Sequence, residues 1–401
     1  MNYDLVFEGG GAKGMVFVGA LQEFEARGYK YGRLLGTSAG AITATLLAAG
    51  YSSDEMLAAL NEKLLDGNSV FTSFMAPPGP FDQAAVNKSS IRAFLHAIKI
   101  PLVPDFLEDK LDDAITEQLA QGKNFRHVFS FVEEGGWYSA DNFITWLERK
   151  LNSGAFSGKP RNFGSMTLRQ FFETTRTELS LVASDTTGKQ MLVLNHVSAP
   201  DCPVVWAARM SMSIPLLWQE VIWQPGWGAY MGRDIHGHSI VDGGLLSNFP
   251  IELFLSDLKD VTCVMGDKTS QNVLGFLIDD DLAVPNAPEI PVVNELINIS
   301  DLATVQRLSR LLDTTLSARD KMVIDSYSNM VVRMPAKGFG TTEFSMSEQR
   351  RNALVEAGRQ AMKTYFSAID HPTSANVSFG IEPQEALRDA TIDRIATKIL
   401  R

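Results

Sequence analysis

The chain has 401 residues, 45% of them hydrophobic and 21% charged, and its 36 basic and 47 acidic side chains give a formal net charge of −11. A single hydrophobic core usually stops growing at about 250–300 residues, so the length allows one large domain with additions or two domains. The acidic balance argues against binding to a phosphate backbone, and nucleic acid is not expected as a partner.

Cysteines and apolar runs indicate neither a disulfide scaffold nor a membrane span. Cys202 and Cys263 are too few for a disulfide framework and lack the paired spacing of a zinc site. No basic segment precedes the first apolar residues, so no signal peptide is expected. The longest uncharged run, Leu34–Ser53, is broken by Gly36 and Gly40 and predicts a strand, a turn and a helix. We therefore expect a cytoplasmic protein, which would need apolar insertion or a partner protein to contact an anionic membrane.

The N-terminal part of the sequence predicts strands that alternate with helices. Apolar residues predict a strand over Tyr3–Glu8 and an amphipathic helix over Met15–Arg27, joined by a glycine-rich loop. A short strand over Arg33–Gly36 precedes a helix over Ala39–Ala49, and Ser52–Glu55 provides capping residues for a third helix that runs to about residue 65. This alternation predicts a mainly parallel central sheet with helices on both faces.

The loop after the first strand, Glu8-Gly9-Gly10-Gly11-Ala12-Lys13-Gly14, lets the backbone approach a ligand closely. Its free N–H groups and the dipole of the following helix favour an anion. A P-loop is excluded because no Lys-Ser or Lys-Thr pair follows the last glycine. Gly9, Gly11 and Gly14 match the dinucleotide fingerprint, but Arg33–Gly36 does not end in the acidic residue that would hold a ribose. A dinucleotide-binding oxidoreductase is thus a weak alternative, and a tight turn without a ligand is another.

The second strand leads into Gly36-Thr37-Ser38-Ala39-Gly40, a G-x-S-x-G pattern before a helix. In this context a serine sits on a sharp turn, and small neighbours leave its hydroxyl clear of the backbone. A hydroxyl needs a base to become a nucleophile, and a tetrahedral intermediate needs hydrogen-bond donors for its oxyanion. Ser38 is therefore a candidate nucleophile, and the glycine loop can supply the donors.

The middle of the chain is less regular. Residues 68–135 contain the apolar loop Phe71–Pro80 and helical stretches with charged faces, which predict an insertion or lid. A helix is predicted over Asp141–Leu151, and strands are predicted over Leu179–Ser184 and Met191–Asn195.

Farther along, the short apolar strand Ile240–Val241 ends in Asp242, which Gly243 and Gly244 follow. Functional residues collect at strand ends of parallel sheets, and the glycines allow another loop to approach the carboxylate. A turn-forming aspartate is the ordinary alternative.

The last third of the chain is predicted to add mainly helices. A further buried strand is predicted over Val261–Met265, and helices are predicted over 293–320 and Ser347–Phe366. Residues 371–401 predict a tail with one amphipathic helix.

In this order, G-G-G-x-[KR]-G, G-x-S-x-G and D-G-[GA] resemble the patatin-like phospholipase family over about residues 3–270, and more loosely over 347–366. Leu181–Gly188 and Ala207–Leu217 are similar to the family as well. The resemblance implies a three-layer α/β fold with helical additions. It implies a catalytic domain over 1–370, which includes the insertion or lid, and a tail over 371–401.

The resemblance also implies a Ser–Asp dyad, in which Ser38 takes the acyl group and Asp242 accepts its proton. The N–H groups of Gly10 and Gly11 would hold the oxyanion, and Gly9 would shape the turn. The residues expected to support the motifs are Lys13, Gly14, Gly36, Gly40, Gly243 and Gly244.

Other residues near the motifs keep alternative roles. Lys13 either steadies the loop, faces a substrate phosphate or has a plain structural role. Glu8 stands where many family members carry Asp, which matters little if it only supports the loop. His236 and His238 are expected in the loop or behind the site, because the family needs no histidine. Seven large apolar residues have alternative roles as well. They either pack in the core, which is the commoner role of such residues, or they line an acyl-chain channel or touch a bilayer. These residues are Phe71, Phe74, Met75, Phe81, Trp218, Trp223 and Trp227.

The implied reaction is acyl transfer to water, with glycerophospholipids or lysophospholipids as substrates at a membrane surface. No metal or cofactor is implied. A protein activator, peripheral contact with a membrane and secretion as an effector stay open. A catalytically silent lipid-binding or interaction protein on the same fold is the alternative function.

Overall fold

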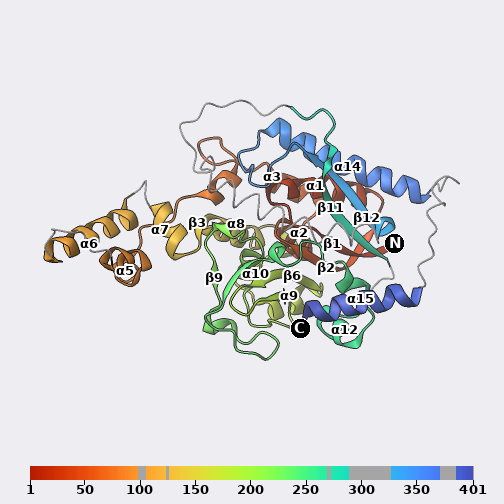
Figure 1. Cartoon of the computed structure of the whole chain (residues 1–401). Coiled ribbons are helices and arrows are strands. Elements are labelled where there is room, and N and C mark those ends of the chain that lie inside the picture. Colours follow the sequence, from red (N-terminus) through yellow and green to blue (C-terminus); the bar gives the residue numbers. More distant parts are fainter. Residues whose placement is uncertain (98–104, 123–125, 269–271, 289–326, 371–384, 401) are drawn as a thin grey trace.

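The computed structural model describes residues 1–97, 105–122, 126–268, 272–288, 327–370 and 385–400, and a sheet of eight strands lies at its centre (Figure 1). The strands are β1 (Asn2–Phe7), β2 (Lys30–Thr37), β6 (Leu179–Asp185), β7 (Gln190–Leu194), β9 (Val221–Ile222), β10 (Ser239–Asp242), β11 (Val273–Ala283) and β12 (Val331–Lys337). Their order is β12-β11-β1-β2-β6-β10-β9, and β7 pairs with β6. Neighbours from β12 to β6 are parallel, whereas β7, β9 and β10 are antiparallel to their partners. The prediction of a mainly parallel sheet is confirmed.

Helices cover both faces of this sheet. One face carries α1 (Val16–Ala26), α2 (Ala39–Ala48), α3 (Ser53–Leu60), α8 (Asp141–Leu151), α9 (Leu168–Thr175), α10 (Val204–Ser211) and α14 (Glu348–Asp370). The other carries α11 (Glu252–Leu255), α12 (Lys259–Met265) and α15 (Glu385–Leu400). Successive strand residues point to opposite faces, so Leu5 and Phe7 join the first apolar cluster and Val6 joins the second. The three-layer α/β fold is thus confirmed.

Two local predictions are confirmed, the helix over Asp141–Leu151 and the capping residues over Ser52–Glu55, whereas one helix is shorter than predicted. The helix predicted over Asp141–Leu151 is α8, with the same ends. Ser52 and Glu55 form a capping box at the start of α3, since each side chain accepts a hydrogen bond from the other residue's backbone N–H. This helix ends at Leu60 rather than at about residue 65.

The strand predicted over Val261–Met265 is wrong, because these residues belong to helix α12. The buried residues Val261, Val264 and Met265 have the spacing of one helical face, and Gly266, at φ 78°, ends the helix. The β-branched residues suggested a strand, but helical packing against α15 decides the conformation. The neighbouring strands β11 and β12 were not predicted, and β11 includes three consecutive aspartates, Asp279–Asp281.

Toward the C-terminus, the predicted helix over Ser347–Phe366 corresponds to α14, and the helix of the predicted tail corresponds to α15. Ile392, Ala396 and Ile399 of α15 are buried in the second apolar cluster. The helix predicted over 293–320 lies outside the described residues.

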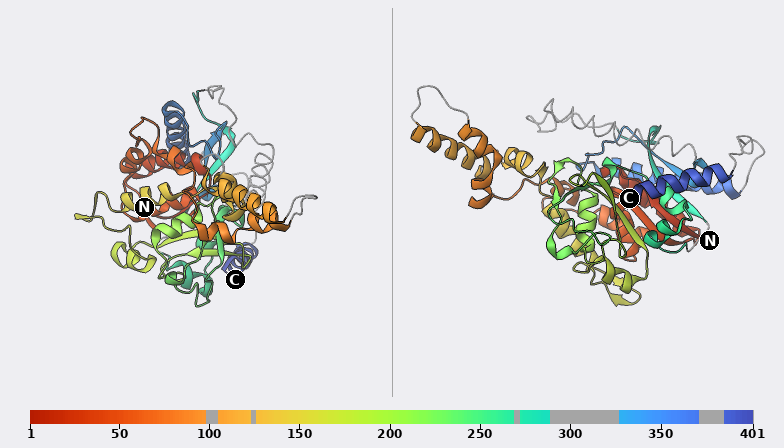
Figure 2. Two further views of the ribbon diagram at one scale, coloured as in Figure 1. Left: turned by 90° about the vertical axis from the view of Figure 1, so that its left-hand side faces the viewer. Right: turned by 60° about the horizontal axis from the view of Figure 1, so that its bottom comes forward.

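The described part of the predicted insertion contains a 3-10 helix, η2 (Val70–Met75), and four helices: α4 (Gln83–Lys88), α5 (Ser90–Ala97), α6 (Asp105–Gln121) and α7 (Arg126–Glu133). In Figures 1 and 2, α5 and α6 project from the rest of the molecule. Two-stranded sheets pair β3 (Gly136–Tyr138) with β8 (Leu216–Trp218) and β4 (Ala155–Phe156) with β5 (Lys159–Pro160). Whether this insertion acts as a lid stays a prediction.

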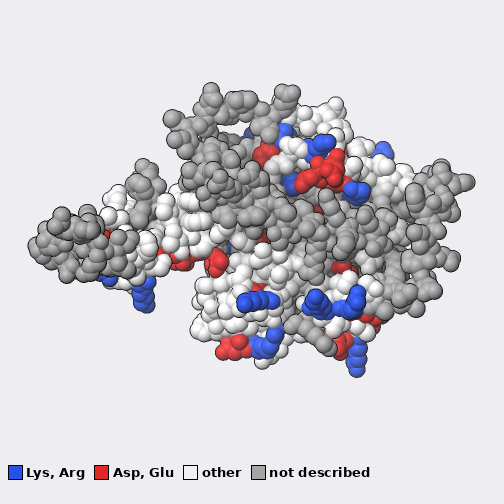
Figure 3. Space-filling view, viewed as in Figure 1, with Lys and Arg blue, Asp and Glu red and all other residues white. Residues whose placement is uncertain are grey.

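The apolar length of the helices and the distribution of surface charge both bear on how the protein could contact a membrane. No helix in the described parts of the chain combines the length and apolar character needed to cross a membrane. On the face seen in Figure 3, basic and acidic side chains are interspersed rather than gathered into one basic patch.

Candidate active site

Strand β6 brings Ser38 and Asp242 together. Thr37, at the end of β2, pairs with Val182, and Asp242, at the end of β10, pairs with Ala183, the next residue of β6. Strand β7 pairs with the same part of β6, so β2 and β10 must share the opposite edge. The two strands therefore meet end to end, and Ser38 follows β2 at this junction.

Ser38 sits on a strained turn between β2 and α2. Its backbone has φ 54° and ψ −119°, a conformation that residues other than glycine seldom adopt. Gly36 and Gly40 make the turn sterically feasible: an added Cβ would lie 2.3 Å from the carbonyl oxygen of Gly40 in the first case and 2.3 Å from that of Phe7 in the second. Ser38 is 5% exposed and is the N-cap residue that precedes α2.

Two further motif glycines allow the loops to approach one another. A Cβ on Gly14 would lie 2.5 Å from Ala39 Cβ, and a Cβ on Gly243 would lie 2.4 Å from the carbonyl oxygen of Val182. Gly244 donates its N–H to Asp242 Oδ1 at 2.8 Å. These contacts explain why small residues surround the serine and the aspartate.

Among the described residues, two backbone N–H groups of the glycine loop have no acceptor. The N–H of Gly9 bonds the carbonyl oxygen of Asn248 at 3.3 Å, and the N–H of Ala12 bonds that of Thr341 at 2.8 Å. The N–H groups of Gly10 and Gly11 donate to no described residue. Gly10 and Gly11 are therefore available as oxyanion donors, whereas the N–H of Gly9 is engaged with Asn248, which fits its expected role in shaping the turn.

The C-terminal end of α10 and the residues that follow it hold the backbones of both candidate catalytic residues. Ser211 Oγ accepts a hydrogen bond from the N–H of Ser38 at 3.0 Å and donates one to the carbonyl oxygen of Val182 at 2.6 Å. The carbonyl oxygen of Ser213 accepts a hydrogen bond from the N–H of Asp242 at 2.9 Å. The similarity of Ala207–Leu217 to the family predicted no role for either serine.

Glu8, Asn248 and Lys13 tie the glycine loop to its neighbours. Asn248 Nδ2 donates to Glu8 Oε1 at 3.2 Å and to the carbonyl oxygen of Gly9 at 2.9 Å. Lys13 is nearly buried and pairs with Asp280 of β11 at 2.8 Å. These contacts favour a loop-steadying role for Lys13 over contact with a phosphate. The role of Asn248 was not anticipated, although it lies six residues beyond Asp242 in the third motif.

Asp242 is buried, with 3% of its surface exposed. Burial raises the pKa of its carboxyl to about 7, and interactions with the Ser38 hydroxyl and the Gly244 N–H oppose this rise. Oδ2 accepts no hydrogen bond of ordinary geometry from any described residue, although the Ser38 hydroxyl is close enough to affect the pKa. A carboxyl that titrates near neutral pH suits a general base.

The nearby histidines are engaged elsewhere. His238 Nδ1 lies 2.9 Å from Asp185 Oδ2 at the far end of β10. His238 precedes Asp242 by four residue steps of a mostly extended segment, which corresponds to about 13 Å between their Cα atoms. The backbone N–H of His236 bonds Asp234 in an exposed turn. These contacts favour the loop roles expected for both histidines.

An apolar cavity of about 750 Å³, counting its open mouth, includes Ser38 in its wall. Phe71, Phe74 and Trp218 line it, as the channel alternative expected. Other large apolar residues pack elsewhere: Trp223 against Trp227 at 5.6 Å between ring centres, Phe81 against Phe129 at 4.6 Å, and Met75 against the main core. The lining residues in the described chain include no charged side chain.

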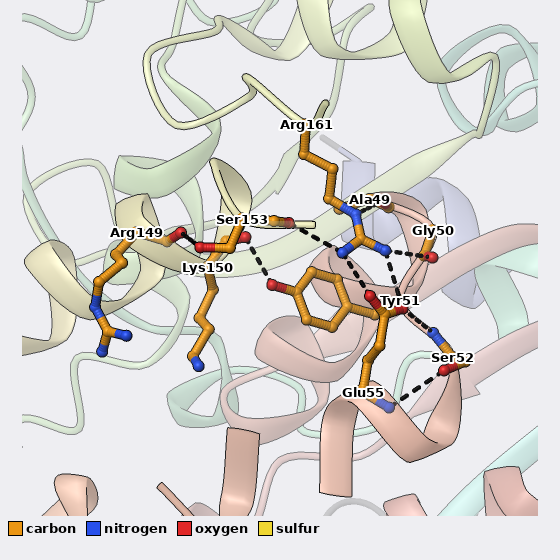
Figure 4. A network of polar contacts seen from close by, with 9 residues as sticks. All are labelled: Ala49, Gly50, Tyr51, Ser52, Glu55, Arg149, Lys150, Ser153 and Arg161. Atoms are coloured by element: carbon orange, nitrogen blue, oxygen red, sulfur yellow. Dashed lines mark hydrogen bonds and ion pairs between the residues drawn. The ribbon is translucent and has the colours of Figure 1, made fainter. Parts of the chain in front are cut away.

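Arg161 holds together the helices that supply part of the cavity wall (Figure 4). Its guanidinium donates to the carbonyl oxygens of Ala49, Gly50 and Ser153 at 2.7–3.0 Å and pairs with Glu55 at 2.8 Å. This network fixes the turn between α2 and α3 against the end of α8.

No group of three or more His, Cys, Asp or Glu side chains in the described ranges is arranged to hold a metal ion.

The sequence matches the family model of patatin-like phospholipases over residues 5–255. It is 28% identical to the uncharacterized protein YqhO of Bacillus subtilis (strain 168) over 376 residues, 91% of this chain and 98% of that protein. It is 21% identical over 249 residues to the "Probable lipid hydrolase 463L" of Invertebrate iridescent virus 6, covering 62% of each chain.

Among solved structures, VipD from Legionella pneumophila is similar with a TM-score of 0.47 at 17% identity, covering 91% of this chain and 67% of that chain. The family match is the decisive comparison, because it spans more than half of the 401 residues and includes all three motifs. The chain belongs to the patatin-like phospholipase family.

Proposed function

We propose that the chain is a serine lipid acyl hydrolase that cleaves acyl esters of phospholipids or lysophospholipids, with Ser38 as nucleophile and Asp242 as its base. The observation that carries the proposal is the end-to-end junction of β2 and β10 on β6, next to an apolar cavity. Family membership and the relative described as a probable lipid hydrolase support lipid hydrolase activity.

In the acylation step, Ser38 Oγ attacks the ester carbonyl carbon while its proton passes to Asp242 Oδ2. The carbonyl electrons move to oxygen, and the N–H groups of Gly10 and Gly11 stabilise the resulting oxyanion. When the intermediate collapses, the C–O bond breaks and the leaving alcohol takes the proton from Asp242. The acyl group stays on Ser38.

Deacylation repeats these steps with water. Asp242 accepts a proton as water attacks the acyl carbon, and the proton returns to Ser38 Oγ when the fatty acid leaves. A pKa of about 7 suits a carboxyl that must both accept and return a proton near neutral pH.

The apolar cavity supports a fatty acyl chain as the group bound beside Ser38, because its lining offers contacts to methylenes and no charge. A membrane surface as the source of substrate, a protein activator, and an effector role stay predictions. The catalytic domain is proposed to cover residues 1–370, since β11, β12 and α14 complete its layers.

The test uses purified protein with mixed phospholipid liposomes, with and without cell extract, and measures released fatty acids and lysophospholipids. The wild-type chain should release fatty acids and react with a fluorophosphonate, and Ser38→Ala should do neither while remaining folded. A catalytically silent binding protein would bind lipid but give no products and no labelling. Hydrolysis by a folded Ser38→Ala variant would refute the proposed nucleophile.

A further inference from the structure

The loop between β12 and α14, residues 338–346, lies against the glycine loop although it falls outside the 5–255 segment that matches the family. The carbonyl oxygen of Thr341 accepts a hydrogen bond from the N–H of Ala12 at 2.8 Å. A Cβ added to Gly11 would lie 2.2 Å from the same oxygen and 2.9 Å from Thr341 Cγ2. The 338–346 loop therefore packs directly on Gly11, whose N–H is one of the groups proposed to stabilise the oxyanion.

Arg350, near the start of α14, holds the 338–346 loop in one shape. Its Nε donates to Glu343 Oε1 at 2.7 Å, and its Nη2 donates to Glu343 Oε2 at 3.1 Å and to the carbonyl oxygen of Gly338 at 2.7 Å. The guanidinium also lies 4.1 Å from the ring centre of Phe339. Glu343 Oε2 accepts a further hydrogen bond from the N–H of Gly340 at 3.0 Å. A bidentate pair of this kind, with the Arg350 side chain buried and the Glu343 side chain 17% exposed, fixes geometry strongly.

Helix α14 is itself fixed against α1, the helix that follows the glycine loop (Figure 1). A Cβ on Gly19 would lie 1.7 Å from the carbonyl oxygen of Val355, and a Cβ on Gly358 would lie 2.0 Å from that of Val16. Backbones in such close contact leave little room for sliding. The 338–346 loop thus has a rigid base next to the site.

Phe344 extends from this loop to the cavity that contains Ser38. Its ring meets the edge of Trp218 with 5.5 Å between ring centres, and Trp218 Nε1 is held by a hydrogen bond to the carbonyl oxygen of Phe74 at 3.0 Å. Phe344 is buried, so its ring occupies space that an acyl chain would otherwise fill. An aromatic wall on a rigid support limits the length or cross-section of a bound chain.

We infer that the 338–346 loop is a working part of the active site. Thr341, held by the Glu343–Arg350 pair, positions the glycine loop, and Phe344 determines which unbranched fatty acyl chains the cavity accepts. This inference rests on the proposed function and extends it to residues outside the family match. Phe344 is the specificity-determining residue, whereas Glu343 and Arg350 are positioning residues.

The chain-length role is tested by binding and by hydrolysis. Saturated fatty acids of 8 to 18 carbons compete with a fluorescent polyene fatty acid for the cavity, and p-nitrophenyl esters of the same lengths serve as substrates. Each further buried methylene contributes about fourfold in affinity. Phe344→Ala should therefore raise the preference for the longest over the shortest chains by about tenfold or more, and Phe344→Trp should lower it.

Phe171→Ala is the matched control, because Phe171 is a buried aromatic of α9 that packs on Phe163 with 5.5 Å between ring centres and does not line the cavity. Its chain-length preference should equal that of the wild type. Unchanged preference in both Phe344 variants would overturn the specificity role. If the wild type hydrolyses no ester, the proposed function fails, but the binding measurement still decides the role of Phe344.

The positioning role is tested with Glu343→Ala, which frees Thr341 to move. We expect kcat per fluorophosphonate-titrated site to fall by about tenfold or more with little change in KM, because misplaced oxyanion donors affect the transition state. The control is Glu356→Ala, which removes a surface partner of Arg359 on the same helix. Equal kcat values in the two variants would overturn the positioning role.

Discussion

The hydroxyl of Ser211 accepts a hydrogen bond from the backbone N–H of Ser38 at 3.0 Å and donates one to the carbonyl oxygen of Val182 in the central strand β6. A strained residue at the start of a helix is thereby tied to the sheet that also carries Asp242. Ser211 contacts no reacting atom in the proposed mechanism, but it fixes the backbone from which the nucleophile extends.

Replacing Ser211 by Ala should lower kcat per labelled site by about tenfold, because small displacements of a nucleophile are costly. It should also cost about 1–3 kcal/mol of stability, since a buried N–H loses its acceptor. Ser198→Ala is the matched control: Ser198 also accepts from a backbone N–H and donates to a backbone carbonyl, near β7. Both variants should melt earlier, but only Ser211→Ala should lose turnover. Equal turnover would contradict the positioning role of Ser211.

The identity of the base separates a dyad from a triad. Asp242→Asn should remove nearly all hydrolysis, because an amide cannot accept the serine proton. His238→Ala should leave turnover within a fewfold, since His238 bonds Asp185 at the other end of β10. In a triad the histidine would be as important as the serine. A loss of about 10³-fold in a stable His238→Ala or His236→Ala variant would show that Asp242 is not the base.

The raised pKa of Asp242 predicts that hydrolysis becomes faster and that the folded state becomes less stable as pH rises. The carboxyl must be ionised to accept a proton, so kcat/KM should rise with pH and level off above about 7. For stability, the unfolded chain releases this proton near the ordinary aspartate pKa of about 3.9, whereas the folded protein keeps it up to about 7. The folded state therefore binds more protons between these values, and its stability falls as pH rises through this window.

Asp242→Asn removes this titration and should make the protein more stable than the wild type at pH 8, on the order of a few kcal/mol. The difference in Tm between variant and wild type should be small at pH 4 and should grow through pH 7. Thermal unfolding at several pH values measures it. A difference that stays constant over this range would contradict the raised pKa.

Gly11 tests the oxyanion loop. Gly11→Ala should reduce kcat by about 10²–10³-fold, because its Cβ would meet Thr341 and shift a proposed donor. Gly28→Ala is the control: Gly28 has φ 70° against 55° for Gly11, but its Cβ would meet nothing within 4 Å. The two substitutions share the backbone strain and differ in the site contact. A raised KM with unchanged kcat in Gly11→Ala would indicate a binding element instead.

By itself, the sequence determined the local features around the motifs. Strand–turn–helix patterns predicted β1, β2, α1 and α2, because apolar spacing, glycines and capping residues act over a few positions. The same signals identified Ser38 and Asp242 as candidates, and the order of the three motifs identified the family. They did not distinguish helix from strand at Val261–Met265, where β-branched residues compete with packing against α15.

Only the tertiary structure decided what depends on residues far apart in the chain. The junction of β2 and β10 arises from their shared edge on β6, and the engagement of Gly9 with Asn248 leaves Gly10 and Gly11 as the available donors. The pKa of Asp242 likewise results from burial by neighbours that no local pattern reveals. Phe344 reaches the cavity that contains Ser38 from outside the family match because the packing of α14 on α1 brings its loop there. Such contacts come from the assembly of layers, which a periodic pattern in one segment does not encode.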